Sequence, residues 1–179
     1  MTKPHFPEIK TERLELKRLL NTDWKMISFL RSDKRVNEFV KRPSTDTQEQ
    51  ALEFIAKINR GIDNNDIFYW KITEKKQNKM IGTICLWNFT EDKTVAEIGY
   101  DLSPTFQGHG FMNEALQGVI DFGFRILKLE TVEAYTHLQN IKSKILLERN
   151  GFVLLPNKTD ESDTDNIIYA LSNPTPIHK

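Results

Sequence analysis

Alternation of apolar and polar positions predicts a first strand near the start of the chain and three more in its middle. Leu14 and Leu16 alternate with charged residues, which places both leucines on one face of a half-buried strand over residues 13–17. Three further strand-like runs, separated by short polar segments, follow at residues 67–73, 80–89 and 95–102. Connections of this length favour an antiparallel meander.

Helical spacing dominates the segments on either side of this meander. Apolar residues three and four apart predict two helices, one after the capping residues 21–23 and one after Asp46 or Thr47. Gly61 and residues 63–65 are predicted to end the second helix. A long third helix follows Pro104, because helical spacing recurs at Met112, Leu116, Val119, Gly123 and Leu127. The remaining elements are a strand, a short helix and two late strands, at residues 131–137, 141–149, 152–155 and 167–171.

This order of elements predicts a mixed α/β sheet rather than a doubly wound one. The 179 residues show no internal repeat and no domain boundary, so we expect a single domain over residues 1–179. Hydrophobic residues make up 39% of the chain and include 11 Phe, which is enough for one sizeable core and excludes disorder of the whole chain.

Charge balance and cysteine content exclude several classes of protein. Lys and Arg number 25 and Asp and Glu number 25, so no global charge favours a nucleic acid or a membrane surface as partner. No segment has the apolar length of a membrane span, and the first residues do not resemble a secretory signal. Cys85 lacks a disulfide partner and lies in an apolar run unsuited to an acyl-cysteine, while His5, His137 and His178 lack metal-ligand spacing. We therefore expect a cytoplasmic protein without a metal.

The stretch most informative about chemistry is residues 100–115, where a strand enters the long helix through a glycine-bearing loop. A helix N-terminus exposes free N–H groups and the positive end of the helix dipole, so it holds phosphate oxygens well. Gly108 and Gly110 allow close approach of the backbone and positive φ. The spacing fits neither the P-loop nor the dinucleotide fingerprint, and Gly-x-Gly alone also fits a tight turn without a ligand.

Three motifs in the same order resemble those of one known family. Gln107, Gly110 and Met112 resemble the R/Q-x-x-G-x-G/A acetyl-CoA loop of the GNAT superfamily of N-acetyltransferases, with Met112 in place of Gly or Ala. Residues 11–16 are similar to the T-x-R-L-x-L opening of its RimJ/RimL-like branch, and residues 140–152 to its N-x-x-S…G-F segment. The resemblance implies a mixed, mostly antiparallel sheet of about seven strands with flanking helices. It also implies a wedge for acetyl-CoA between two splayed strands.

The resemblance assigns residues to the acetyl-CoA site one by one. The pantetheine arm would pair with the backbone of Tyr100, Asp101 and Leu102, as an added strand would. The pyrophosphate would face the amides of six loop residues: Gln107, Gly108, His109, Gly110, Phe111 and Met112. Their side chains, including the imidazole of the loop, are expected to matter less than their N–H groups.

Two side chains are candidates for proton transfer. Ser143 lies three residues after Asn140 at the start of a helix, so both can reach the thioester end of acetyl-CoA. The resemblance implies that the Ser143 hydroxyl gives a proton to the departing thiolate, while Asn140 also fits a plain helix N-cap. Glu97 lies on the strand face opposite Tyr100 and is our candidate base, acting directly or through water. Glu97 equally fits a solvent-facing strand residue, and Tyr100 fits a packed core aromatic.

The acceptor is the part of the reaction on which the sequence says least. Attack on a thioester needs a neutral amine, and an α-amino group with a pKa of about 8 meets that need at pH 7 more often than a lysine at about 10.4. The resemblance implies the N-terminus of a ribosomal-type protein, and a small-molecule amine or a non-catalytic CoA-binding module stays open. A late acidic loop fits either a cationic acceptor or a solvated hairpin tip: Asp160, Glu161, Asp163 and Asp165. Monomer and homodimer are both compatible with the sequence.

Overall fold

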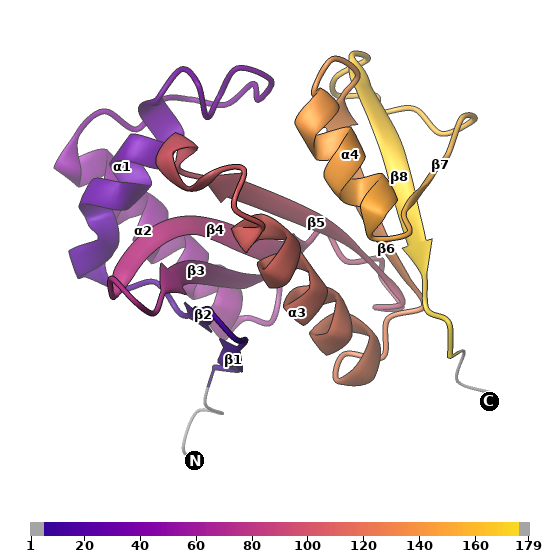
Figure 1. Ribbon diagram of the computed structural model, residues 1–179, viewed down its shortest axis with the longest axis horizontal. Helices are drawn as coiled ribbons and strands as arrows, with labels where there is room; N and C mark the ends of the chain where they lie inside the picture. The colour runs from indigo at the N-terminus through magenta and orange to yellow at the C-terminus, as the bar shows by residue number, and fades with distance from the viewer. Residues whose placement is uncertain (1–5, 176–179) are drawn as a thin grey trace.

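In the computed structural model, which describes residues 6–175, one mixed sheet runs through the molecule in the order β1-β2-β3-β4-β5-β6-β8-β7 (Figure 1). The eight strands within this range are β1 (Ile9–Lys10), β2 (Leu14–Lys17), β3 (Phe68–Glu74), β4 (Lys79–Trp87), β5 (Val95–Leu102), β6 (Thr131–His137), β7 (Val153–Leu154) and β8 (Asn166–Ser172). The same described residues form four α-helices: α1 (Trp24–Ser32), α2 (Gln48–Asp63), α3 (Phe111–Arg125) and α4 (Ile141–Arg149). His5 and His178, which the metal prediction included, lie outside the described residues.

The predicted mixed sheet and its antiparallel meander are confirmed. Strands β2 to β5 pair antiparallel in sequence order, and β5 with β6 is the parallel pair of the described sheet. The described sheet has one strand more than the seven expected, and the additional strand is β1. It has two residues and is too short for an alternating pattern to predict it. Helix α2 ends at Asp63 with Asn64 as its C-cap, among the polar residues predicted to end it, and it runs through Gly61 without a break. A Cβ at Gly61 would lie 2.8 Å from the Ile67 side chain, so this glycine provides a close approach inside the helix.

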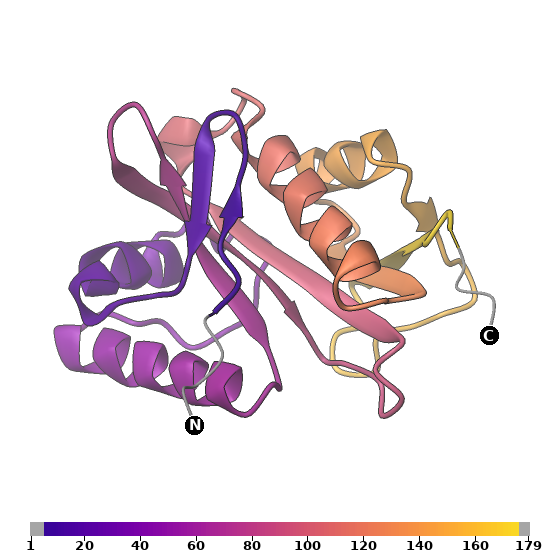
Figure 2. The same ribbon diagram turned by 90° about the horizontal axis from the view of Figure 1, so that it is seen from below.

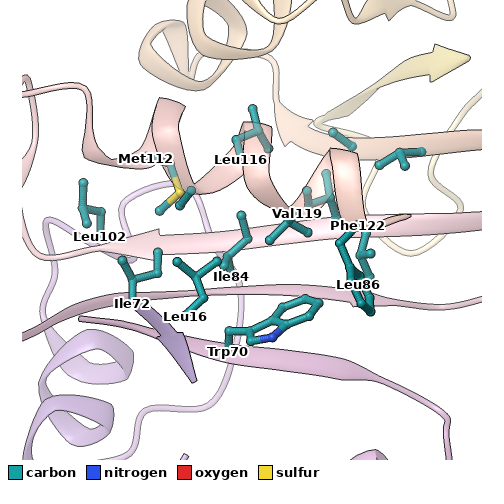
Figure 3. Close-up of a cluster of buried hydrophobic side chains, with 14 of the residues drawn as sticks. Leu16, Trp70, Ile72, Ile84, Leu86, Leu102, Met112, Leu116, Val119 and Phe122 are labelled. Carbon is teal, nitrogen blue, oxygen red and sulfur yellow. The ribbon is translucent and has the colours of Figure 1, made fainter. Parts of the chain in front are cut away.

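Helices cover both faces of the sheet. Figure 2 shows α1 and α2 on one side and α3 and α4 on the other. The larger core lies under α3 and includes Leu116, Val119 and Phe122 of that helix, with the Phe122 ring 5.4 Å from the Trp70 ring between centroids (Figure 3). Leu14 and Leu16 both point into this core, as their alternation predicted. A smaller core beneath α1 and α2 includes a cluster of buried side chains: Leu19, Ile27, Ala51, Ile55, Ile58 and Tyr69. Within residues 6–175, no helix is long and apolar enough to cross a membrane.

The feature that positions the site is the divergence of β5 from β6. Their pairing runs from Val95 opposite Thr131 to Ile98 opposite Ala134. Beyond this point β5 continues to Leu102 beside β4, and β6 continues to His137 beside β8. Figure 1 shows the two halves of the sheet separating toward the end where α4 begins. The splayed pair of strands that the resemblance implied is therefore present.

Candidate active site

A cleft of about 730 Å³ opens where β5 and β6 diverge. Glu97 and Tyr100 line it from β5, and Ser143 lines it from α4. Two connecting segments complete its wall: residues 39–41, between α1 and α2, and residues 159–163, between β7 and β8. The cleft therefore brings together both predicted proton-transfer residues.

Glu97 occupies one face of β5 and carries a perturbed carboxyl group. It is half-buried, and the Asn88 amide donates to its Oε2 at 3.3 Å. Burial raises the pKa of Glu97 to about 7, with further raising by the negative charges of Asp160 and Glu133 and opposition from the Asn88 hydrogen bond. A carboxylate with a pKa near the working pH is suited to accept a proton.

Ser143 and Tyr100 form a hydroxyl pair at the other side of the cleft. Their oxygen atoms lie 2.7 Å apart, and the Ser143 side chain is buried. Burial raises the pKa of Tyr100 to about 12, so its hydroxyl keeps its proton at neutral pH. Asn140 Oδ1 accepts a hydrogen bond from the Ser143 amide at 3.2 Å, so Asn140 is the N-cap of α4 while it also lines the cleft. No local sequence pattern identifies the hydroxyl pair, because its two residues are 43 positions apart.

The glycine loop has the backbone conformation that an anion-binding turn needs. Gly108 and Gly110 have φ values of 80° and 77°, in the left-handed region that side chains disfavour. Gly110 is the N-cap of α3 and has no side chain to bond the first amides of the helix. Met112, the departure from the family motif, is buried in the core beneath α3 (Figure 3). Its side chain therefore leaves the loop surface free.

Gln107 shapes the loop through its side chain more than through its amide. Its Nε2 donates to the Leu102 carbonyl at 3.1 Å, and its Oε1 accepts from Lys142 Nζ at 3.3 Å. The Gln107 amide, which the resemblance placed against the pyrophosphate, instead donates to the Pro104 carbonyl at 3.2 Å. The amide positions open to a ligand are therefore those of residues 108–112, and Gln107 joins the end of β5 to α4.

The side of the cleft that residues 39–41 form depends on contacts that the sequence did not reveal. Arg42 Nη1 lies 2.8 Å from Asp101 Oδ2, which attaches the α1–α2 segment to β5. The rings of Phe39 and His137 lie 5.3 Å apart between centroids. These pairs join positions far apart in sequence, so no local pattern identifies them.

Two aspartates of the acidic loop, Asp160 and Asp163, form hydrogen bonds or ion pairs that hold the loop in place. Asp160 accepts hydrogen bonds from Ser162 and from the Asn166 amide, the latter at 2.8 Å. Asp163 lies 2.8 Å from Lys41 Nζ, so it links the loop to the segment between α1 and α2. These bonds keep the pKa of both aspartates below the usual range, with the side-chain partners Asn166 and Lys41 as the largest causes.

Cys85 lies on the same sheet face as Glu97 but has the wrong chemistry for an acyl carrier. Burial raises the pKa of its thiol to about 12, so the nucleophilic thiolate is scarce at neutral pH. This agrees with the prediction that no acyl-cysteine forms. Among residues 6–175, no group of three or more metal-ligating side chains is assembled.

Comparison with known proteins identifies the family. Residues 13–153 match the model described as acetyltransferase (GNAT) domain. The uncharacterized N-acetyltransferase p20 of Bacillus licheniformis is 34% identical over 143 residues, which cover 79% of this chain and 80% of that protein. The spermidine N(1)-acetyltransferase of Vibrio cholerae is 29% identical over 82 residues, covering 46% and 47% of the two chains. RimL, a ribosomal L7/L12 alpha-N-protein acetyltransferase solved with coenzyme A, has a TM-score of 0.81 at 20% identity and covers 93% of this chain and 98% of its own. The chain therefore belongs to the GNAT family and is an N-acetyltransferase.

Proposed function

We propose that this N-acetyltransferase acts in the cytoplasm, transferring the acetyl group of acetyl-CoA to the N-terminal α-amino group of a ribosomal-type protein. One observation carries the proposal. Glu97, whose pKa burial raises to about 7, and the Tyr100–Ser143 hydroxyl pair line the same cleft where β5 leaves β6, with Glu97 and Tyr100 on opposite faces of β5 and Ser143 on α4. A base on one side and a proton donor on the other match the two proton transfers of amide formation.

Acetyl-CoA supplies an activated acetyl thioester, and the chain offers a fitting backbone surface for it. The amides of residues 108–112 surround the uncapped start of α3, which suits the pyrophosphate. The β5 edge at Tyr100, Asp101 and Leu102 lies beyond the last pair with β6, which suits the amides of the pantetheine arm. The Leu102 carbonyl has one partner already, the Gln107 side chain.

The side chains of the cleft then divide the chemistry between them. Glu97 takes a proton from the acceptor ammonium group, directly or through water, so that the neutral amine forms the new C–N bond. As the C–S bond breaks, Ser143 gives its proton to the thiolate sulfur and takes up, directly or through water, the proton that the nitrogen of the new C–N bond must lose to become an amide. Either hydroxyl can donate in the Tyr100–Ser143 pair. In the proposed step Tyr100, which its raised pKa keeps protonated, donates to Ser143 Oγ and leaves the Ser143 proton free for the sulfur.

A polyamine is the second candidate for the acceptor. The spermidine N(1)-acetyltransferase among the relatives supports it, as RimL among the structural neighbours supports a protein N-terminus. The carboxylates that line the cleft, Glu97, Asp160, Glu161 and Asp163, suit an acceptor with a second positive charge. Parallel assays with peptides bearing free or blocked N-termini and with spermidine separate the two acceptors.

Thermal unfolding with acetyl-CoA, CoA and ATP is the experiment that tests the proposal. A ligand at about 100 times its Kd adds about 2.7 kcal/mol of stability. We expect both CoA species to raise Tm and ATP to leave it unchanged. If CoA raises Tm but Glu97→Gln and Ser143→Ala leave acetyl transfer unchanged, the assigned catalytic residues are wrong. Absence of transfer to every amine tested, with CoA bound, would favour a CoA-binding module.

A further inference from the structure

The glycine loop is held from outside by the turn between β1 and β2. Glu114, in the first turn of α3, accepts hydrogen bonds on Oε1 from the Thr11 hydroxyl at 2.6 Å and from the Arg13 amide at 2.7 Å. Its Oε2 accepts from Arg13 Nε at 2.7 Å. Both carboxylate oxygens therefore bind a segment about 100 residues away in the chain. Burial alone would raise the pKa of Glu114, but hydrogen bonds from Thr11 and Arg13 keep it below the usual value.

The guanidinium group of Arg13 also contacts the glycine loop itself. Its Nη1 donates to the His109 carbonyl at 2.9 Å, and its guanidinium carbon lies 4.5 Å from the centre of the Phe111 ring. A Cβ added to Gly110 would lie 3.4 Å from Nη2 of the same arginine. Arg13 therefore lies against three consecutive residues, 109–111, in the turn where the proposed anion site begins.

One of these contacts determines the direction of an amide. The peptide bond between His109 and Gly110 is planar and trans, so its N–H points opposite to its C=O. Because Arg13 holds the carbonyl, the Gly110 N–H is directed away from Arg13. Glycine rotates with little steric cost, so a peptide next to Gly110 needs such a restraint to keep one orientation.

We propose that Arg13, anchored by Glu114, is a positioning residue for the pyrophosphate of the acetyl donor. It does not have to touch the ligand, since it acts by fixing the loop peptide whose N–H faces the ligand side. This inference rests on the proposed use of acetyl-CoA and adds a residue from the N-terminal hairpin to that site. It also gives the Thr11-x-Arg13 opening and Glu114 a shared role.

A truncated acetyl donor tests the proposal, because S-acetylpantetheine has the thioester and lacks the pyrophosphate. The variants are Arg13→Met and, as a matched control, Arg18→Met. Arg18 likewise joins the N-terminal part of the chain to a helix, with Nε 2.7 Å from Asn59 Oδ1 and Nη1 2.9 Å from Asp63 Oδ1 in α2. The control therefore loses comparable bonds without affecting the loop.

For Arg13→Met we expect a fall of about tenfold in kcat/KM with acetyl-CoA, entirely through KM, as for loss of one charged hydrogen bond. Activity with S-acetylpantetheine should stay at the wild-type level, and Kd for CoA should rise by the same factor as KM. Arg18→Met should leave the ratio of the two acetyl donors unchanged. Glu114→Gln should shift this ratio in the same direction as Arg13→Met.

The outcomes separate the two proposals. If wild-type protein does not bind CoA, the proposed function fails and this inference fails with it. If wild-type protein binds CoA and Arg13→Met binds it equally well, the positioning role alone is wrong. An equal loss with both acetyl donors would make Arg13 a general stabilising residue. Should S-acetylpantetheine react too slowly to measure, the Kd values for CoA decide.

Discussion

The two walls of the proposed active site are built in different ways. The proposed acetyl-donor wall, residues 100–112, meets the cleft at Tyr100 and is one continuous stretch shaped by backbone hydrogen bonds and two glycines with positive φ. The proposed acceptor wall combines two segments far apart in sequence, residues 33–47 and 155–165, which meet through side chains. A continuous motif preserves one ligand chemistry, while loops can change without disturbing the sheet. We therefore expect donor and acceptor selectivity to be separable in this molecule.

Within the acceptor wall, two cations differ in burial. Arg42 is 17% exposed and its partner Asp101 12%, and Arg42 Nε also donates to Asn37 at 2.7 Å. Lys41 is 69% exposed in its ion pairs with the acidic loop. Arg42 should therefore maintain the wall, while Lys41 should contribute little to its stability. Substitutions on each side of the cleft test this contrast.

Glu97→Gln should have the largest effect, because it removes the proposed base without changing the shape of the site. We expect kcat/KM to fall by about 10²- to 10⁴-fold, with CoA binding unchanged. In the wild type, kcat/KM should rise with pH through about 7 as Glu97 loses its proton, and this limb should be absent from the variant. A limb that survives in Glu97→Gln with the same midpoint would assign it to another group.

Glu97→Gln should lower activity but raise thermal stability at neutral and higher pH. A carboxyl group whose pKa rises from 4.5 to about 7 on folding binds its proton more tightly in the folded state. Its stabilising contribution is present at low pH and is lost as pH rises through about 7. Glu97→Gln should therefore have a higher Tm than the wild type above neutral pH and lose this advantage as the pH approaches 4.5. Equal Tm values across this range would contradict the raised pKa.

Arg42→Met should be the most damaging change in the acceptor wall. It leaves the largely buried Asp101 carboxylate without its cation, which costs about 3 kcal/mol in the free energy of unfolding. Urea denaturation measures this loss. The double variant with Asp101→Asn should recover part of it, because the uncompensated charge is gone. At temperatures where Arg42→Met stays folded, we expect KM for the acceptor to rise and KM for acetyl-CoA to stay constant. A rise in both would show that the two walls are coupled.

Tyr100→Phe should lower kcat by about fivefold to tenfold, as expected for the loss of one hydrogen bond to a reacting group. Kd for CoA should not change, because the ring still packs. The Ser143→Ala variant provides the reference. If the two hydroxyls act as a unit, the double variant should be no slower than Ser143→Ala alone. Additive losses would show that Tyr100 acts independently of Ser143.

The contrast between the walls also explains what the sequence could predict. Strand alternation at Leu14 and Leu16 and helical spacing along α3 are local patterns, so the sequence could predict the order of elements along the chain and the mixed sheet, and both are confirmed. The glycine loop was identifiable because its chemistry lies in consecutive residues. Tyr100 with Ser143 and Arg42 with Asp101 are 43 and 59 residues apart, so only folding brings them together.

Lys41→Ala should have the smallest effect, and it sharpens the comparison with Arg42. The exposed ammonium group lies 2.8 Å from Asp163 and 3.4 Å from Asp165, where salt screens such pairs. We expect Tm to stay at the wild-type value and the acceptor KM to change by about twofold or less. For a cationic acceptor that change should be a decrease, since removing Lys41 frees Asp163 to attract it, and high salt should abolish the difference. A large loss of stability would mean that Lys41, like Arg42, holds the acceptor wall together. The contrast between a buried Arg42 that stabilises the wall and an exposed Lys41 that does not would then be wrong.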